Sequence, residues 1–546
     1  MEGEFLKELK ALDEFRLRFR ARHPEAQLER DDPDVRRLLE SLAFFTMRTR
    51  LLAQHNLVAT WRRLFANYFD FLLAPMPAMA MVQAQVTLRR TEVGVLARGS
   101  EIKVTAPDGT VGTFRTLADL RVLPVRLERV QVLLLPSGGF RLVLDLHAAS
   151  GTRSEQLGML RLHVRYLDDY ATSLRALYNL RVHLQKTTVV YDQSVDEKTV
   201  GAPCQVSFGS LPETSDSAEG EPHPIETVRS FFHFPEQELF LNVQIPPAQR
   251  AWSHVSLCLD LGADWPRSPA PSPDLFQLGV VPVINLRRES AQPITLDGTQ
   301  DAYPIRYPLP GREYELRALR GVYVKDPKDK ARGPVPLRHG VLPGVNTSET
   351  YEIEEREDPS GTTPWIILRM PEAFASPKLV LIDATWHQPR FDEHATGRLK
   401  VTLVERTLEG LDWRVVGPVR PHVDSPMRGN ALALIETLSM NMKAVLELDE
   451  VRALLGWLGT VRDGAFRALP AKLRELRSEQ APDSALRGIG IRHIYHIKLE
   501  GYDPDDEALV HTFLVQVRAL LDSWNQAAAV ELHADTSGSP LQLPVQ

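Results

Sequence analysis

The chain has 546 residues, of which 43% are hydrophobic and 25% charged, and its formal net charge is -7. This composition is typical of an ordinary soluble protein, and the negative balance excludes a protein that binds nucleic acid through its overall charge. Only two cysteines occur, Cys204 and Cys258, which excludes a disulfide framework and a four-cysteine zinc site within one chain.

The start of the chain carries no pattern for export. Residues 1–4 read Met-Glu-Gly-Glu, which is acidic where a secretory signal is basic, and no apolar region follows. No run approaches the roughly 20 apolar residues that cross a bilayer. We therefore expect a cytoplasmic protein without direct membrane insertion, divided into several domains of roughly 100 to 200 residues each.

Residues 1–77 are predicted to form a helical N-terminal segment. Asp32 is placed to cap a helix whose first residue is Pro33. Apolar residues recur with helical spacing in three stretches, and we expect the second and third helices to pack as a hairpin. The apolar positions are Phe5, Leu9, Leu12, Phe15 and Phe19, then Val35, Leu38, Leu39, Leu42 and Phe45, then Leu57, Trp61, Leu64, Phe65, Tyr68, Phe69 and Leu72.

After Pro77 the apolar residues alternate, as they do in strands. Turn residues at Asp108-Gly109 and at Ser137-Gly138-Gly139 separate alternating segments, so each predicts a β-hairpin. We expect an antiparallel β domain at 78–208, followed by a polar linker at 209–225.

The second half is predicted to hold two further domains. Alternating segments predict a second β-rich domain at 226–425, and helical spacing returns at 429. The tail at 429–546 then reads as helices followed by a β-α-β module, whose helix runs from Asp505 to Gln526. The predicted fold class is therefore a multidomain α+β protein with a helical N-terminal segment, two antiparallel β-rich domains and a C-terminal helical and α/β module.

The sequence shows no recognisable catalytic or nucleotide-binding motif, since it has neither a phosphate-binding loop nor a nucleophile elbow. His493 and His496 are expected to lie on opposite faces of a strand, where they cannot share a metal ion. Asp168-Asp169 precedes a helical pattern, which favours helix capping over paired acid/base catalysis. We predict no catalytic residue, no cofactor and no metal.

His387 and His394 flank Asp392-Glu393, which allows a metal site in principle. Proline and arginine at positions 389 and 390 instead indicate a surface loop.

Five blocks of sequence, in one order along the chain, resemble the TssF family, a baseplate wedge subunit of the bacterial type VI secretion machine. The blocks are 32–83, 98–116, 160–180, 234–236 and 276–304, the last reading FQLGVVPVINLRRESAQPITLDGTQDAYP. The chain departs from the family at 384–387, where it reads Ala-Thr-Trp-His in place of the frequent Cys-Thr-Asn-Arg. The resemblance implies a structural subunit and not an enzyme.

The resemblance also implies partners. They are a TssG-like wedge subunit, a second copy of the chain, a TssK-like adaptor, a TssE-like sheath initiator and a VgrG-like spike hub, in a baseplate docked at the inner membrane. One alternative is a baseplate protein of a phage tail or of another contractile injection system. Another is a β-rich hydrolase or carbohydrate-binding protein, with Trp252, Trp365 or Trp386 as an aromatic platform.

Large apolar residues on the predicted helices, together with flexible methionines after them, are candidates for contact with a partner. Core packing is the alternative for each of them, and for Trp524 the two possibilities are burial in the C-terminal module or anchorage of a second chain. The candidate interface residues are Trp61, Phe65, Met76, Met79, Leu509, Phe513 and Trp524.

Overall fold

The computed structural model describes residues 2–23, 32–66, 70–87, 92–148, 157–210, 223–247, 251–309, 313–325, 335, 349–358, 361–370, 377–404, 408, 410–426, 431–439, 443, 445–459, 464–483, 490–524, 529–536 and 539–542. The chain divides into two compact units. The first contains Met1–Asp70, His339–Val345 and Asn430–Ile435, and the second contains the other residues. Helices and several antiparallel sheets occur together, which confirms the α+β class.

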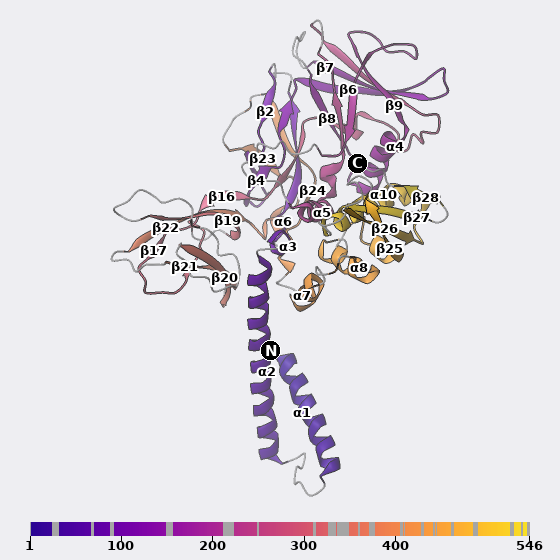
Figure 1. The fold of residues 1–546 in the computed structure, drawn as a ribbon. Helices are drawn as coiled ribbons and strands as arrows, with labels where there is room; N and C mark the ends of the chain where they lie inside the picture. The colour runs from indigo at the N-terminus through magenta and orange to yellow at the C-terminus, as the bar shows by residue number, and fades with distance from the viewer. Residues whose placement is uncertain are drawn as a thin grey trace. The chain divides into compact units, whose positions relative to one another are not determined.

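The first unit contains a hairpin of two helices, α1 (Glu2–Arg22) and α2 (Pro33–Ala66) (Figure 1). The amide of Asp34 donates to Oδ1 of Asp32 over 2.9 Å. Asp32 therefore caps α2 and Pro33 is its first residue, as predicted. Arg50 Nη1 of α2 lies 2.6 Å from Glu8 Oε1 of α1 and links the two helices.

The predicted division of α2 into two packed helices is wrong. One helix of 34 residues extends to Ala66, and the short α3 (Asp70–Leu73) follows. Neither glycine nor proline occurs between Asp34 and Ala66, so no residue ends the helix where its apolar stripe changes. The helix that packs against α2 is α1.

The largest sheet lies in the second unit and has six strands in the order β23-β3-β4-β15-β1-β24. Phe391 of α6 (Phe391–His394) packs edge-on against Phe114 in its core, with ring centroids 5.3 Å apart. The predicted hairpin at Asp108-Gly109 joins β3 to β4, and Gly109 has the positive φ that the turn requires. The strands are β1 (Met79–Val86), β3 (Glu101–Thr105), β4 (Val111–Thr116), β15 (Val280–Ile284), β23 (Lys400–Leu403) and β24 (Leu411–Arg420).

This sheet contains strands from both predicted β domains. β1, from residues 78–208, pairs on one side with β15 and on the other with β24, both from residues 226–425. Alternation identifies a strand but not its partner, because partner choice depends on contacts between distant parts of the chain. Independent folding of the four predicted segments stays a prediction.

Two further sheets lie in the same unit, with strand orders β10-β9-β13-β7-β6 and β11-β12-β8-β14. The predicted hairpin at Ser137-Gly138-Gly139 joins β6 to β7. Residues 211–222 of the predicted linker lie outside the described residues. The strands are β6 (Val125–Leu134), β7 (Phe140–Ala148), β8 (Met159–Val164), β9 (Leu184–Tyr191), β10 (Ala202–Pro203), β11 (Gln205–Phe208), β12 (Phe240–Gln244), β13 (His254–Leu261) and β14 (Phe276–Gln277), with the small pair β2 (Gly94–Leu96) and β5 (Leu120–Val122) and the helices α4 (Tyr170–His183) and α5 (Pro224–His233).

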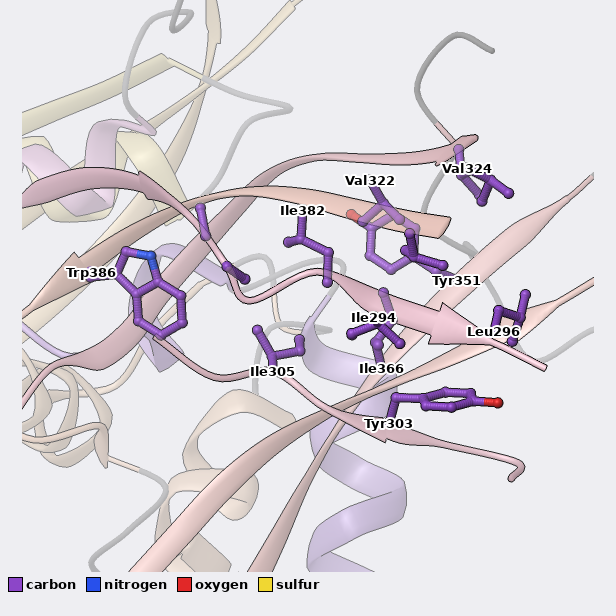
Figure 2. Close-up of a cluster of buried hydrophobic side chains, with 14 residues drawn as sticks. Ile294, Leu296, Tyr303, Ile305, Val322, Val324, Tyr351, Ile366, Ile382 and Trp386 are labelled. Atoms are coloured by element: carbon purple, nitrogen blue, oxygen red, sulfur yellow. The ribbon is translucent and has the colours of Figure 1, made fainter. Parts of the chain in front are cut away.

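Residues between β15 and β23 form a β-sandwich. One sheet contains β16, β17, β19 and β22, and the other contains β18, β20 and β21. Figure 2 shows the buried side chains that fill the space between them, among them Trp386, whose indole Nε1 donates to Glu289 O over 2.9 Å. The strands are β16 (Arg287–Ser290), β17 (Ile294–Leu296), β18 (Tyr303–Pro304), β19 (Glu315–Lys325), β20 (Thr350–Asp358), β21 (Gly361–Arg369) and β22 (Lys378–His387).

Asn285 and Gln388 connect this sandwich to the six-stranded sheet. The backbone N–H of Gln388 donates to Asn285 Oδ1 over 2.7 Å, and Asn285 Nδ2 donates to Gln388 Oε1 and to Thr113 O, each over 3.2 Å. Asn285 is fully buried. The Asn285 side chain therefore bonds both the backbone and the side chain of Gln388, at the point where the chain enters and leaves the sandwich.

Replacing Asn285 with alanine is expected to destabilise this junction. The change leaves the backbone N–H of Gln388 without its acceptor and removes the Asn285 donor from Thr113 O, and each orphaned polar group costs about 1–3 kcal/mol. Thermal denaturation should show a lower melting temperature, and limited proteolysis should cut the chain faster near the junction. A melting temperature equal to that of the wild type would contradict this role.

The C-terminal module has the sheet order β25-β26-β27-β28, and α10 connects the parallel strands β26 and β27. The predicted order of strand, helix and strand is thus confirmed, while β25 and β28 were not predicted. α10 packs on β27 and also on α4 and α5. The elements are β25 (Leu473–Asp483), β26 (Gly490–Leu499), α10 (Glu507–Trp524), β27 (Ala529–Thr536) and β28 (Ser539–Gln542), preceded by α7 (Ala431–Ser439), α8 (Leu448–Trp457) and α9 (Leu469–Lys472).

Candidate protein-protein interface

The predicted interface residues lie mainly in the core. Met76 and Met79 are buried around the six-stranded sheet. Leu509, Phe513 and Trp524 are buried on α10. Their part in binding a partner stays a prediction, but their side chains fill the interior of this chain and do not form its surface.

The other two candidates lie on α2. Trp61 is half-buried, and Phe65 belongs to the helix while its side chain lies outside the described residues.

The helical hairpin instead exposes other large apolar residues. Leu38 is 71% exposed, Phe45 63% and Phe15 64%. We define the exposed apolar surface of the hairpin as Phe15, Phe19, Leu38, Leu42, Phe45 and Leu52. Exposed apolar patches on soluble proteins are typical of interaction sites, which makes this surface the candidate interface.

The spacing of the residues explains why they are left exposed. On α2, Leu38, Leu42 and Phe45 follow one another at four and three residues and therefore share one face. Ala43 and Met47 are buried on a different face of the same helix. Because α2 has apolar residues on more than one face, a single partner helix covers only part of them.

The sequence itself carries a signal for this surface. The stripe that contains Leu38, Leu42 and Phe45 is wider than the seam of two helices, which takes about two positions in seven. Apolar residues beyond such a seam are typical of a helix that packs against more than one partner.

The most enzyme-like cluster in the described residues contains Asp145, His254 and Ser256. His254 Nε2 lies 3.5 Å from both Ser256 Oγ and Asp145 Oδ1, while Ser256 Oγ donates to Asp145 Oδ1 over 2.7 Å. In a nucleophilic triad the base takes the proton of the serine, and the carboxylate holds the base. Here the hydroxyl donates to the carboxylate and Ser256 is fully buried, so this arrangement presents no nucleophile to a substrate.

The histidine pair His493 and His496 and the aspartate pair Asp168-Asp169 lie as the sequence predicts. His493 is buried on β26 and His496 is exposed, as expected from their spacing. Asp169 Oδ1 accepts from the Thr172 amide over 3.2 Å, which confirms that it caps α4.

His387 and His394 bind different groups. The ring of His387 stacks on His422 with centroids 4.8 Å apart, and His394 Nδ1 lies 2.7 Å from Asp108 Oδ2. Within the described ranges, no group of three or more His, Cys, Asp or Glu side chains is arranged to hold a metal ion.

The proposed aromatic platforms are largely covered. Trp252 and Trp386 are buried, so neither can stack on a sugar at the surface. Trp365 is half-buried, and the guanidinium of Arg356 lies 4.6 Å from its ring centroid. No described helix is both long and apolar enough to cross a membrane.

Comparison with known proteins identifies the family. A search of curated protein sequences gives no match. A chain in the cryo-electron microscopy structure of the type VI secretion system TssK-TssF-TssG baseplate subcomplex aligns with a TM-score of 0.73 and 18% identity, over 94% of this chain and 98% of that one. A chain in the baseplate complex from the type VI secretion system aligns with a TM-score of 0.61 and 17% identity, over 97% of this chain and 96% of the other. These alignments show a shared fold, and the family model described as "Type VI secretion system, TssF" matches residues 4–359, so this chain belongs to the TssF family.

Proposed function

We propose that the chain is a structural subunit of the baseplate wedge of a type VI secretion system and binds its wedge partners through the hairpin of α1 and α2. The exposed apolar surface of the hairpin carries this proposal. Because each large apolar side chain gains about 1.5–3 kcal/mol when it is fully removed from water, covering this surface favours association strongly. Further helices with apolar faces are its natural complement.

The partners follow from the family. The solved relative is part of a subcomplex with TssK and TssG, and we propose a TssG-like subunit and a second copy of this chain as the proteins that cover the hairpin. A TssK-like adaptor, a TssE-like sheath initiator and a VgrG-like spike hub complete the proposed assembly. The proposed location is the cytoplasm, in a baseplate docked at the inner membrane.

The role proposed is mechanical and not catalytic. The buried serine of the Asp145 cluster and the covered tryptophans give no support to a hydrolase or a carbohydrate-binding protein. The family match favours the type VI machine over a phage tail.

Replacing Leu38, Leu42 and Phe45 together with glutamine is expected to abolish co-purification with the co-expressed TssG-like subunit. Glutamine keeps the helix propensity of α2, and the three side chains are exposed, so the melting temperature of the isolated chain should stay close to that of the wild type. Affinity purification and native mass spectrometry of the complex measure the effect.

The matched control replaces Leu134 and Val200 with glutamine. Both residues lie in the second unit, where Leu134 is 63% and Val200 85% exposed. This control is expected to keep the partner bound. Unchanged recovery of the TssG-like subunit with the hairpin variant would reject the hairpin as the binding surface.

A further inference from the structure

A cavity of about 1390 Å³ lies in the second unit where several sheets meet. Its walls include residues of β1 and β24 from the six-stranded sheet, the beginning of β6, and residues of β8 and β14. Pockets for small molecules usually measure roughly 300–1,000 Å³, so this cavity is larger than a small ligand requires.

Four arginines line the cavity: Arg121 of β5, which donates to Leu157 O, and Arg126, Arg161 and Arg414 on three other strands. Arg126 of β6 donates through Nε and Nη2 to Val86 O, over 2.9 and 2.6 Å. Arg414 of β24 donates through Nε to Gln83 Oε1 over 2.9 Å. Arg161 of β8 donates through Nε to Asn242 Oδ1 over 3.3 Å, and its guanidinium lies 4.3 Å from the centroid of the Phe240 ring.

These hydrogen bonds hold the guanidinium groups in place without pairing them directly with a carboxylate, although Glu238 attracts the charge of Arg161. For Arg126, Arg161 and Arg414 the acceptors are a backbone carbonyl and two side-chain amides, and none of these three arginines forms an ion pair with a carboxylate of the described residues. Burial lowers the pKa of Arg161, which reflects the cost of holding its charge away from water. A guanidinium remains charged in proteins, so a carboxylate brought to it gains a charge-assisted hydrogen bond.

The acidic residues that line the cavity influence which anionic ligands it prefers. Asp119, Asp274 and Asp412 also line it, and Asp119 Oδ1 accepts from the Arg98 amide over 2.7 Å. The cavity therefore carries both basic and acidic side chains and does not attract every anion equally. A ligand whose carboxylates are separated along a chain can pair these carboxylates with the arginines. The uncharged parts of the ligand between its carboxylates can then lie beside the aspartates without repulsion.

We propose that this cavity receives an extended acidic segment of another protein chain, whose carboxylates pair with Arg126, Arg161 and Arg414. The volume exceeds that of a small oxyanion, and the three guanidinium groups come from three strands. The net charge of the chain, -7, disfavours general attraction of acidic peptides, so binding of such a segment requires a local site. This inference goes beyond the proposed wedge role and does not depend on the hairpin.

Fluorescence anisotropy with a fluorescein-labelled peptide of alternating glutamate and serine tests the site on the purified full-length chain. The wild type is expected to bind this peptide and to bind the matched glutamine-serine peptide at least about tenfold more weakly, because charged hydrogen bonds are stronger than neutral ones. Arg161→Gln and Arg414→Gln should each weaken binding of the glutamate peptide about tenfold. Arg398→Gln, an exposed arginine outside the cavity, is the matched control and should bind like the wild type.

The wild type itself provides a test that needs no variant, since added salt should weaken binding of the glutamate peptide. Absence of binding, equal binding of both peptides, or an equal loss with Arg398→Gln would overturn the proposal. Inorganic phosphate distinguishes a small anion site. If phosphate raises the melting temperature of the wild type but not of Arg161→Gln, and the glutamate peptide does not bind, the cavity holds a small oxyanion and the proposal is wrong.

Discussion

Replacing Trp524 with alanine is expected to lower the free energy of unfolding of the C-terminal module by about 3 to 5 kcal/mol, the usual cost of removing a buried aromatic side chain. Trp524 is the last residue of α10 and is only 8% exposed. α10 is covered by β27 on one side and also contacts α4 and α5, so the cavity left by the indole would have protein around it. Differential scanning calorimetry should show a lower melting temperature for the transition that includes this module.

Asp522→Ala provides the matched control for Trp524→Ala. Asp522 lies in the same last turn of α10 but is exposed, so its replacement should change the stability by less than about 0.5 kcal/mol. An unchanged melting temperature of Trp524→Ala together with loss of the wedge partner would show that Trp524 anchors an interface. An unchanged melting temperature with the partner still bound would reject both roles.

Sequence patterns that depend only on neighbouring residues predicted the local structure correctly. The cap at Asp32, the cap at Asp169 and the turn at Asp108-Gly109 depend on side chains and backbone angles next to the feature they form. The helix of the C-terminal module was predicted at 505–526 and forms as Glu507–Trp524, because its apolar period is long and is followed by strand alternation.

Features that depend on distant residues could not be predicted in the same way. The pairing of β1 with β24 and the contact of Asn285 with Gln388 join segments that no periodic pattern relates. Periodicity shows that the face of the strand or helix that carries Met79 or Phe513 must be covered. It does not show whether the core of the same chain or a partner chain covers that face. The cavity arginines are spread over four strands, so only the folded chain brings them to one site.

Two buried histidines are expected to make the stability of the chain depend on pH. His163 of β8 lies beside the Phe240 ring, and its Nε2 is 3.2 Å from Glu236 O. Burial lowers the pKa of His163 to about 4 from its ordinary value of 6.5. His233 of α5 has Nε2 3.1 Å from Pro77 O, and burial lowers the pKa of His233 to about 3.

The direction of the pH effect on stability follows from the pH at which the unfolded and the folded chain each protonate these histidines. The unfolded chain protonates these histidines near pH 6.5, whereas the folded chain keeps them neutral until about pH 4 for His163 and about pH 3 for His233. Their contribution to stability is therefore complete above pH 6.5 and is lost as the pH falls toward the folded pKa values. Between pH 7 and about pH 5, protonation of each histidine in the unfolded chain lowers the free energy of unfolding by about 2 kcal/mol, at 1.36 kcal/mol per pKa unit, or by about 4 kcal/mol for the pair.

Urea denaturation at pH 7 and at about pH 5 measures this loss, and glutamine variants assign it to the two residues. His163→Gln cannot take up a proton, so its stability should fall less than that of the wild type between these pH values, by about 2 kcal/mol, and a variant that also carries His233→Gln should recover about 4 kcal/mol. Leu162→Ala removes a fully buried neighbour of His163 and should destabilise the chain at both pH values without changing the difference between them. A pH-dependent loss in the double variant as large as in the wild type would show that other groups, and not these buried imidazoles, control the response to acid.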